Sequence, residues 1–140
     1  MTSAVPEYSG IHFLTTAIHP DNRFYLSAAS LAGEGMYMAL GDDKQLLVVK
    51  LGDGSYQVGV GLRLPQGWSS DNASLLKDPL TLRKWLAEGP FADWPKAHTD
   101  MIRHSDGDFL NWPLYAMPTE ALSWQTVPGV ALVGDAAHLT

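Results

Sequence analysis

The sheet of this protein is encoded in residues 36–64, which read MYMAL-GDDK-QLLVVKL-GDG-SYQVGVGLRL. Three runs rich in aliphatic and β-branched residues are separated by two short turn sequences, GDDK at 41–44 and GDG at 52–54. Glycine and aspartate tolerate the positive φ angles that tight hairpin turns require. The stretch therefore predicts three consecutive antiparallel strands joined as a meander.

The third of these runs has two unlike faces. Alternation along a strand places Tyr56, Val58, Val60 and Leu62 on one face and Gln57, Gly59, Gly61 and Arg63 on the other. The first face is expected to be buried. The second contains two glycines, which weaken a strand unless something must approach its backbone closely. Two interpretations are open: a solvent-facing side with a bulge, or a flat floor under a planar ligand with Gln57 as a hydrogen-bonding group.

Ahead of the meander, the sequence predicts one strand and one short helix. Ile11–Ile18 is rich in β-branched and aromatic residues, which is typical of a strand. The first ten residues are expected to be a lead-in. Residues 19–22, His-Pro-Asp-Asn, end the strand because proline lacks an N–H group and Asp and Asn favour turns. A short helix is expected over Phe24–Ala32.

After the meander, apolar residues recur at helical spacing between Leu75 and Leu86. Asp78 followed by Pro79 is a typical helix start, because aspartate can cap the first turn and proline suits its first position. Gly89 is expected to end this helix.

A second helix is expected to begin near Asp93, which can cap it, and to run to His104. Residues 105–108 are expected to form a loop. Phe109–Met117 has the composition of a strand, in which Pro113 demands an edge position or a bend because it cannot donate to a ladder.

The last segment carries the most specific motif. Val130–Val133 is a continuous apolar run bounded by glycines, which is typical of a strand buried on both faces. GDAAH follows at 134–138, so the pattern is strand, tight turn and helix-forming residues. A helix N-terminus behind a buried strand is a place where N–H groups and a carboxylate can meet a polar cofactor.

Composition limits the function. The chain has 140 residues, enough for one domain, and a formal net charge of -6, which disfavours binding to nucleic acid. No apolar run reaches the roughly 18 residues of a membrane helix, so no membrane association is expected. The absence of cysteine excludes disulfides and thiolate nucleophiles and fits a cytoplasmic location.

The sequence shows no arrangement of residues typical of a catalytic or metal-binding site. His12 and His19 lie seven positions apart, and His98 and His104 lie six apart, so neither pair has the spacing of metal ligands. No Ser/His/Asp triad is evident, and no nucleophile accompanies His138. The sequence therefore predicts neither a metal site nor catalytic residues.

Residues 130–138, VALVGDAAH, resemble the second flavin-binding motif of class A flavoprotein monooxygenases, a family of FAD-dependent aromatic-ring hydroxylases. The upstream order of strands, turns and Trp-Pro segments is similar to the family's middle domain, most of all in its tetracycline-degrading branch. The resemblance implies an α+β fold, with a mostly antiparallel sheet and two to three helices on one side. It assigns residues 1–129 to a substrate-binding domain and residues 130–140, with one orphan strand, to a remnant of the FAD-binding domain.

The same resemblance implies a set of site residues. Gly134 and Asp135 correspond to residues that approach FAD, with the Asp135 carboxylate on its sugar-alcohol part. The face with Gln57 and Gly59 lines the substrate cavity above the flavin ring. Tyr37 and Met38 lie near another substrate-facing position, with the register open by one residue. Independently of the resemblance, Trp112 is the tryptophan expected near a ligand, because it lies on the last predicted strand of the sheet.

Departures from the family pattern qualify the function. These residues contain no Gly-x-Gly-x-x-Gly motif for the ADP half of FAD and lack the family's central Asp-Gly motif, which serves FAD and NAD(P)H. The loop that follows GDAAH in the family is also missing. The expectation is a substrate-binding fragment of an FAD- and NAD(P)H-dependent monooxygenase that hydroxylates a planar aromatic or polyketide-like molecule. By itself, the chain is expected to bind no cofactor and to be inactive.

Other functions stay open. The chain could be a stand-alone, flavin-free domain that binds a small hydrophobic molecule, or a cofactor-independent isomerase or cyclase. It could also be complemented by a second chain that carries the missing halves. Since the strand at 130–133 would lack its neighbours, it is expected either to pair with a second copy of the chain or to pack back irregularly.

Overall fold

The computed structural model of the chain describes residues 4–122, 125 and 127–138. Its centre is a five-stranded antiparallel sheet with the order β2-β3-β4-β1-β5. The strands are β1 (Glu7–Ile18), β2 (Met36–Gly41), β3 (Lys44–Lys50), β4 (Tyr56–Arg63) and β5 (Asp106–Ala116). The α+β fold expected from the sequence is confirmed.

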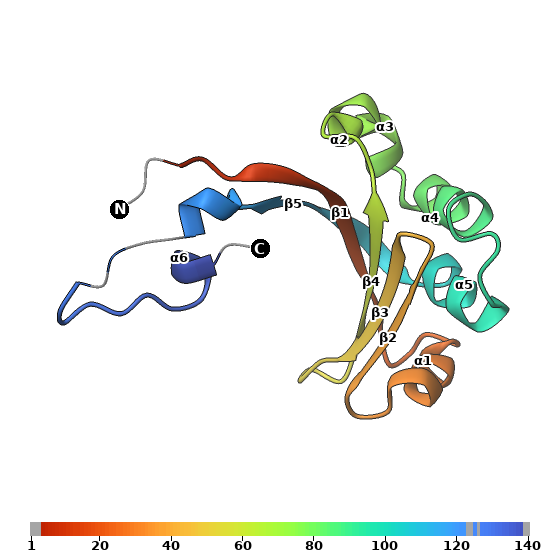
Figure 1. Ribbon diagram of the computed structural model, residues 1–140. Coiled ribbons are helices and arrows are strands. Elements are labelled where there is room, and N and C mark those ends of the chain that lie inside the picture. The colour runs from red at the N-terminus through yellow and green to blue at the C-terminus, as the bar shows by residue number, and fades with distance from the viewer. Residues whose placement is uncertain (1–3, 123–124, 126, 139–140) are drawn as a thin grey trace.

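Five helices cover one side of the sheet and leave the other side open (Figure 1). They are α1 (Tyr25–Ala32), α2 (Trp68–Asp71), α3 (Ala73–Leu76), α4 (Pro79–Glu88) and α5 (Lys96–Arg103). A 3-10 turn, η1 (Thr119–Leu122), and a short helix, α6 (Asp135–His138), follow β5. None of the helices in the described part of the chain combines the length and apolar character needed to span a bilayer.

The meander of β2, β3 and β4 is confirmed. Asp42 and Asp43 have φ angles of 50° and 57°, the pair of positive values found in the tight hairpin turns that match strand twist. The pairing of β4 with β3 and with β1 runs without a register shift. The bulge that the two glycines of β4 suggested is therefore absent, and that interpretation is wrong.

The core lies between the sheet and the helices. Every second residue of β4 faces it, from Tyr56 to Leu62, as the alternation predicted. Leu82 and Leu86 of α4 and Met101 and Ile102 of α5 complete the core from the helix layer. Because these side chains are removed from water, they provide most of the stability of the sheet-helix packing.

The α4 start is confirmed, whereas the start of α5 differs from expectation. Asp78 Oδ1 accepts a hydrogen bond from the Thr81 amide at 3.2 Å, and Pro79 occupies the first turn. The residue before α5 is Pro95, and Asp93 does not cap the helix. Its carboxylate instead accepts a hydrogen bond from Lys44 Nζ at 3.0 Å, because that charged partner outweighs a backbone amide.

Two strand boundaries also differ from expectation. β1 begins at Glu7, within the residues expected to be a lead-in, because Glu7 pairs with Ala116 of β5. β5 begins at Asp106, so the expected loop at 105–108 is wrong. A register irregularity between Thr15 and Ala17 lets the extra residues of β5 continue the pairing. β5 lies at the edge of the sheet, where Pro113 is tolerated, as predicted.

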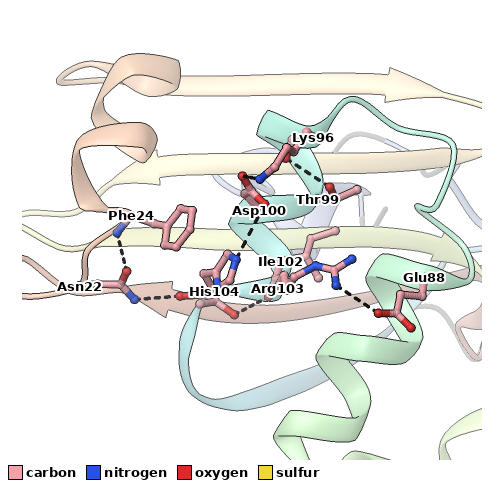
Figure 2. A network of polar contacts seen from close by, with 10 residues as sticks. Asn22, Phe24, Glu88, Lys96, Thr99, Asp100, Ile102, Arg103 and His104 are labelled. Atoms are coloured by element: carbon pink, nitrogen blue, oxygen red, sulfur yellow. Dashed lines mark hydrogen bonds and ion pairs between the residues drawn. The ribbon is translucent and has the colours of Figure 1, made fainter.

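Figure 2 shows how the turn after β1 is fastened to α5. Asn22 Nδ2 donates to the His104 carbonyl at 2.8 Å, and Asn22 Oδ1 accepts from the Phe24 amide at 2.8 Å. The rings of Phe24 and His104 stack with centroids 3.9 Å apart. Asp100 accepts from Lys96 Nζ at 2.6 Å and lies 3.8 Å from His104 Nε2. These contacts bring α1 and α5 onto the same side of the sheet.

The expected strand at 130–133 does not form. These residues have no strand assignment, and Val130, Leu132 and Val133 are exposed. A strand needs a neighbour to satisfy its N–H and C=O groups, and none of the described strands lies in register with this segment. The segment does not pack into the core either. Pairing with a second copy of the chain stays a prediction.

Candidate functional site

The register of the sheet gathers one set of side chains on the side opposite the helices. Three rows cross the strands: Leu40, Gln45, Gly61, Phe13 and Trp112; Met38, Leu47, Gly59, Thr15 and Leu110; and Met36, Val49, Gln57, Ala17 and Asp106. We call these residues the open face. Asp106, at the β5 end of the third row, is the one ionisable residue among them, although the chain as a whole has 24 acidic and basic residues, 15 and 9 respectively. Arg63 continues the same face of β4 beyond the first row.

Phe13 occupies the space above the two glycines of β4. A Cβ atom built on Gly61 would lie 2.8 Å from Phe13 Cε2, and one built on Gly59 would lie 3.4 Å from Phe13 Cε1. The first distance is shorter than van der Waals contact, so a side chain at Gly61 would displace the ring. The planar group that approaches this backbone is therefore Phe13 itself, and its ring forms part of the floor of the open face.

Trp112 lies on the open face at the β5 edge. Its indole Nε1 donates to Thr15 Oγ1 at 3.1 Å across the β1–β5 pair, while the residue is 52% exposed. The hydrogen bond orients the polar edge of the indole toward the sheet. The rest of the ring system stays available at the rim of the open face.

The register separates Tyr37 from Met38. Met38 belongs to the open face and is 45% exposed. Tyr37 points to the helix side, where its hydroxyl is hydrogen-bonded to His98 Nε2 at 2.7 Å. Burial lowers the pKa of His98. Of the residues expected to contact substrate, the open face brings together Met38, Gln57, Gly59 and Trp112, and it excludes Tyr37.

The polar groups in the middle of the open face are neutral, and the Asp106 carboxylate at its margin accepts hydrogen bonds from the His19 amide at 2.8 Å and from Asn22 Nδ2 at 2.7 Å. The side-chain amides of Gln45 and Gln57 make no hydrogen bond within the part of the chain that the structure describes. Each offers one acceptor and two donors. The nearest ionised group along β4 is Arg63, whose Nε lies 2.9 Å from Asp43 Oδ1 at the end of the strand. A hollow of about 270 Å³ opens between this ion pair and Gln45.

Gly134 and Asp135 do not build a cofactor site with the rest of the described chain. Asp135 is the first residue of α6 and is exposed. Apart from its two chain neighbours, no atom of the described residues lies within 4 Å of the position that a Cβ would take at Gly134, so the backbone faces open space there. The side chain of His138 lies outside the described residues. These residues therefore do not fit FAD as a built cradle.

A serine–histidine pair that sequence analysis missed lies on the helix side. His12 is fully buried, with Nε2 at 2.8 Å from Ser69 Oγ and Nδ1 at 2.6 Å from the Tyr8 hydroxyl. Because Tyr8 donates to the Leu64 carbonyl at 2.7 Å, it must accept from His12 Nδ1–H, so Nε2 accepts from Ser69. Asn111 Nδ2 donates to the same Ser69 oxygen at 2.8 Å.

This hydrogen-bonded chain is satisfied by a neutral His12, and burial lowers the pKa of that histidine accordingly. These hydrogen bonds join α2 to β1 and β5 on the helix side of the sheet. The one unpaired atom of this hydrogen-bonded chain in the described structure is the buried Oδ1 of Asn111. The pairing of Ser69 with His12 depends on the position of α2, so no spacing in the sequence could have revealed it. Among the described residues, no group of three or more metal-ligating side chains is placed to bind a metal ion.

Comparison with solved structures identifies the class of protein that has this fold. Klebsiella pneumoniae HpxO, solved as a complex with FAD and uric acid, matches 99% of this chain with a TM-score of 0.66 and 23% sequence identity. The tetracycline destructase Tet(51) matches 96% of the chain with a TM-score of 0.53 and 17% identity. The fold is therefore that of the FAD-dependent monooxygenases, and the resemblance inferred from the sequence is confirmed.

A curated relative gives the same result from sequence. Monooxygenase asqM of Emericella nidulans is 25% identical over 165 residues, which cover 96% of this chain and 37% of that protein. HpxO and Tet(51) are likewise matched over 32% and 33% of their lengths. The chain thus spans about a third of the length of each of these relatives. A search of family models finds no match.

Proposed function

We propose that this chain forms the substrate-binding sheet of an FAD-dependent monooxygenase and that a planar aromatic or polyketide-like molecule lies on the open face. One observation carries the proposal: the register collects Met38, Gln57, Gly59 and Trp112 on the sheet face opposite the helices, with no charged residue in its central row. The fold likeness to proteins that bind FAD, one of them together with uric acid, supports it.

The physical character of the open face suits such a ligand. Met36, Met38 and Leu40 of β2 and Leu110 and Trp112 of β5 are all exposed large apolar residues. Exposed apolar patches commonly mark binding sites. Covering it would gain roughly 25 cal/mol for each Å² removed from water. The two strands at the sides and the Phe13 floor between them offer a flat surface to a flat molecule.

The role of the chain is to bind and orient. Since Gly134 and Asp135 form no cradle with the described residues, we assign no step of flavin chemistry to this chain. The purified chain should show no stoichiometric binding of FAD at concentrations on the order of tens of micromolar. Tight binding, read from flavin absorbance and fluorescence, would contradict this assignment.

The lack of an FAD cradle around Gly134 and Asp135 in the described residues also favours a second candidate function. A flavin-free domain could use the open face to bind a small hydrophobic molecule, or to act on it as a cofactor-independent isomerase or cyclase. The two candidates share the ligand-binding face and differ in the need for flavin. Mixing the chain with a flavin-loaded partner protein and assaying substrate-dependent oxidation of NAD(P)H would separate them.

Methionine methyl groups provide a direct test of the face itself. Met36 and Met38 lie on the open face, whereas Met101 is fully buried in the core. In ¹³C-methyl-labelled protein, titration with an anthraquinone carboxamide should shift the Met36 and Met38 resonances through the ring current of the bound molecule. Met101 is the internal control and should not shift. Binding without a shift at Met36 or Met38 would show that the ligand lies elsewhere.

A further inference from the structure

The open face differs from the rest of the molecular surface in its charge. Its central row, Met38, Leu47, Gly59, Thr15 and Leu110, is uncharged from one edge of the sheet to the other. The lysines of β3 point away from it: Lys44 Nζ donates to the Pro90 carbonyl and Lys50 Nζ to the Gly54 carbonyl, both at the helix side. No cation is therefore available beneath a ligand in the middle of the face.

The cation at the end of the face is already paired. Arg63 Nε contacts Asp43 Oδ1 at 2.9 Å, and both side chains are exposed. Recruiting this guanidinium to an anionic ligand would place Asp43 beside the same anion. The chain's net charge of -6 adds a weak long-range repulsion of the same sign.

The polar side chains of the face that have unused donors and acceptors near its middle are amides. Gln45 and Gln57 flank the Gly59–Gly61 segment on the open face, each with an unused side-chain amide in the described structure. Amides pair well with carbonyl, hydroxyl and amide groups of a neutral molecule. An ionised carboxylate or phosphate covered on this surface would lose hydration without a compensating charge, which is costly.

Resting on the proposed function, we propose that the ligand of the open face is an uncharged planar ring system whose edge carries carbonyl or hydroxyl groups, paired with Gln57 and Gln45. Phe13 forms the floor beneath the rings, and Trp112 bounds them at the β5 edge. Molecules with the same rings and an ionised substituent are discriminated against by the cost of burying an unpaired charge.

A matched pair of ligands tests this inference. Anthraquinone carboxamide and anthraquinone carboxylate share one ring system and differ at one substituent, which is neutral in the first and ionised at neutral pH in the second. Binding of both to the 140-residue chain is followed by the methyl resonances of Met36 and Met38. The carboxamide should bind about tenfold more tightly than the carboxylate, because the carboxylate finds no cation. The difference should persist at 1 M salt, where repulsion by the net charge is screened within about 3 Å.

Substitutions locate the origin of the preference. Gln57→Arg places a cation on the open face and should reverse the order of the two affinities. Leu80→Arg adds the same charge at an exposed position of α4 on the helix side and should leave the order unchanged. Gln57→Leu should weaken carboxamide binding by roughly five- to tenfold through the lost hydrogen bonds, with little effect on the carboxylate.

The outcomes separate the two proposals. If both ligands shift Met36 and Met38 with equal affinity, or the carboxylate binds more tightly, the inference about charge is overturned while the open face remains the binding site. If neither ligand shifts these methyl groups, the proposed function fails and the inference fails with it. If Leu80→Arg reverses the preference as Gln57→Arg does, the selectivity arises from net charge and the role of Gln57 is overturned.

Discussion

The two faces of the sheet follow opposite rules. On the helix side of the sheet, Tyr56 and Val58 are buried, and even the polar His12 on that side has hydrogen-bond partners on both ring nitrogens. On the open side, Met38 and Trp112 expose apolar surface, and Gln57 leaves an amide unused. A sheet face that only contacts water usually carries charged side chains instead. The helix face is thus buried and hydrogen-bonded, whereas the open face leaves apolar side chains and an amide exposed to solvent.

A matched pair of leucines provides the largest expected effect. Leu46 of β3 is fully buried on the helix side, whereas Leu40 of β2 is 73% exposed on the open face. Leu46→Ala should lower the free energy of unfolding by about 2–5 kcal/mol, since it leaves a cavity in the core. Leu40→Ala should change it by less than about 0.5 kcal/mol.

Urea denaturation of both leucine variants measures this contrast. Equal losses would mean that the open face is itself covered in solution, for example by a second copy of the chain, and would blur the distinction between the two faces.

The floor of the open face gives the next largest effect. Gly61→Ala should lower the free energy of unfolding by about 1–3 kcal/mol, because the new Cβ would lie 2.8 Å from the Phe13 ring and overlap it. Phe13→Ala removes the ring, so adding Gly61→Ala to that variant should lower the free energy of unfolding much less than it does in the original protein. The double variant therefore measures the coupling between the two positions. Additive losses in the double-mutant cycle would show that Phe13 does not lie over Gly61.

The buried histidine of the helix face gives a smaller, pH-dependent effect. Burial lowers the pKa of His12 below the ordinary 6.5, so the unfolded chain binds more protons than the folded chain in the range between the two values. Stability is then fully present above about pH 6.5 and declines as the pH falls toward the folded-state pKa. His12→Gln should flatten this decline.

Other histidines limit how much His12→Gln can change. Burial also lowers the pKa values of His98 and His104, so part of the acid sensitivity should persist in the variant. His19→Gln replaces an exposed histidine and is the matched control, in which the decline should stay steeper than in His12→Gln. Thermal melts between about pH 7 and about pH 5 give the comparison. An unaltered slope in His12→Gln would mean that His12 is not held neutral by the fold.

Local patterns predicted most of the architecture. The turn aspartates at 42 and 43, the Asp78–Pro79 helix start and the edge position of Pro113 each depend on one or two residues and their backbone preferences. The expectations that failed involved competition between partners. Asp93 accepts a hydrogen bond from Lys44 and does not cap α5. The segment at 130–133 has no neighbouring strand among the described residues and does not form a strand.

The sequence by itself determined the meander, the alternating faces of β4 and the family resemblance, because turn chemistry, strand periodicity and a short motif are readable over a few adjacent residues. Only the tertiary structure decided which residues share the open face. The β1–β4 pairing brings Phe13 onto Gly61, the β1–β5 pairing brings Trp112 to Thr15, and the β2 register turns Met38 out and Tyr37 in. Such pairings depend on the packing of distant segments, and a shift of one residue would have exchanged the two faces.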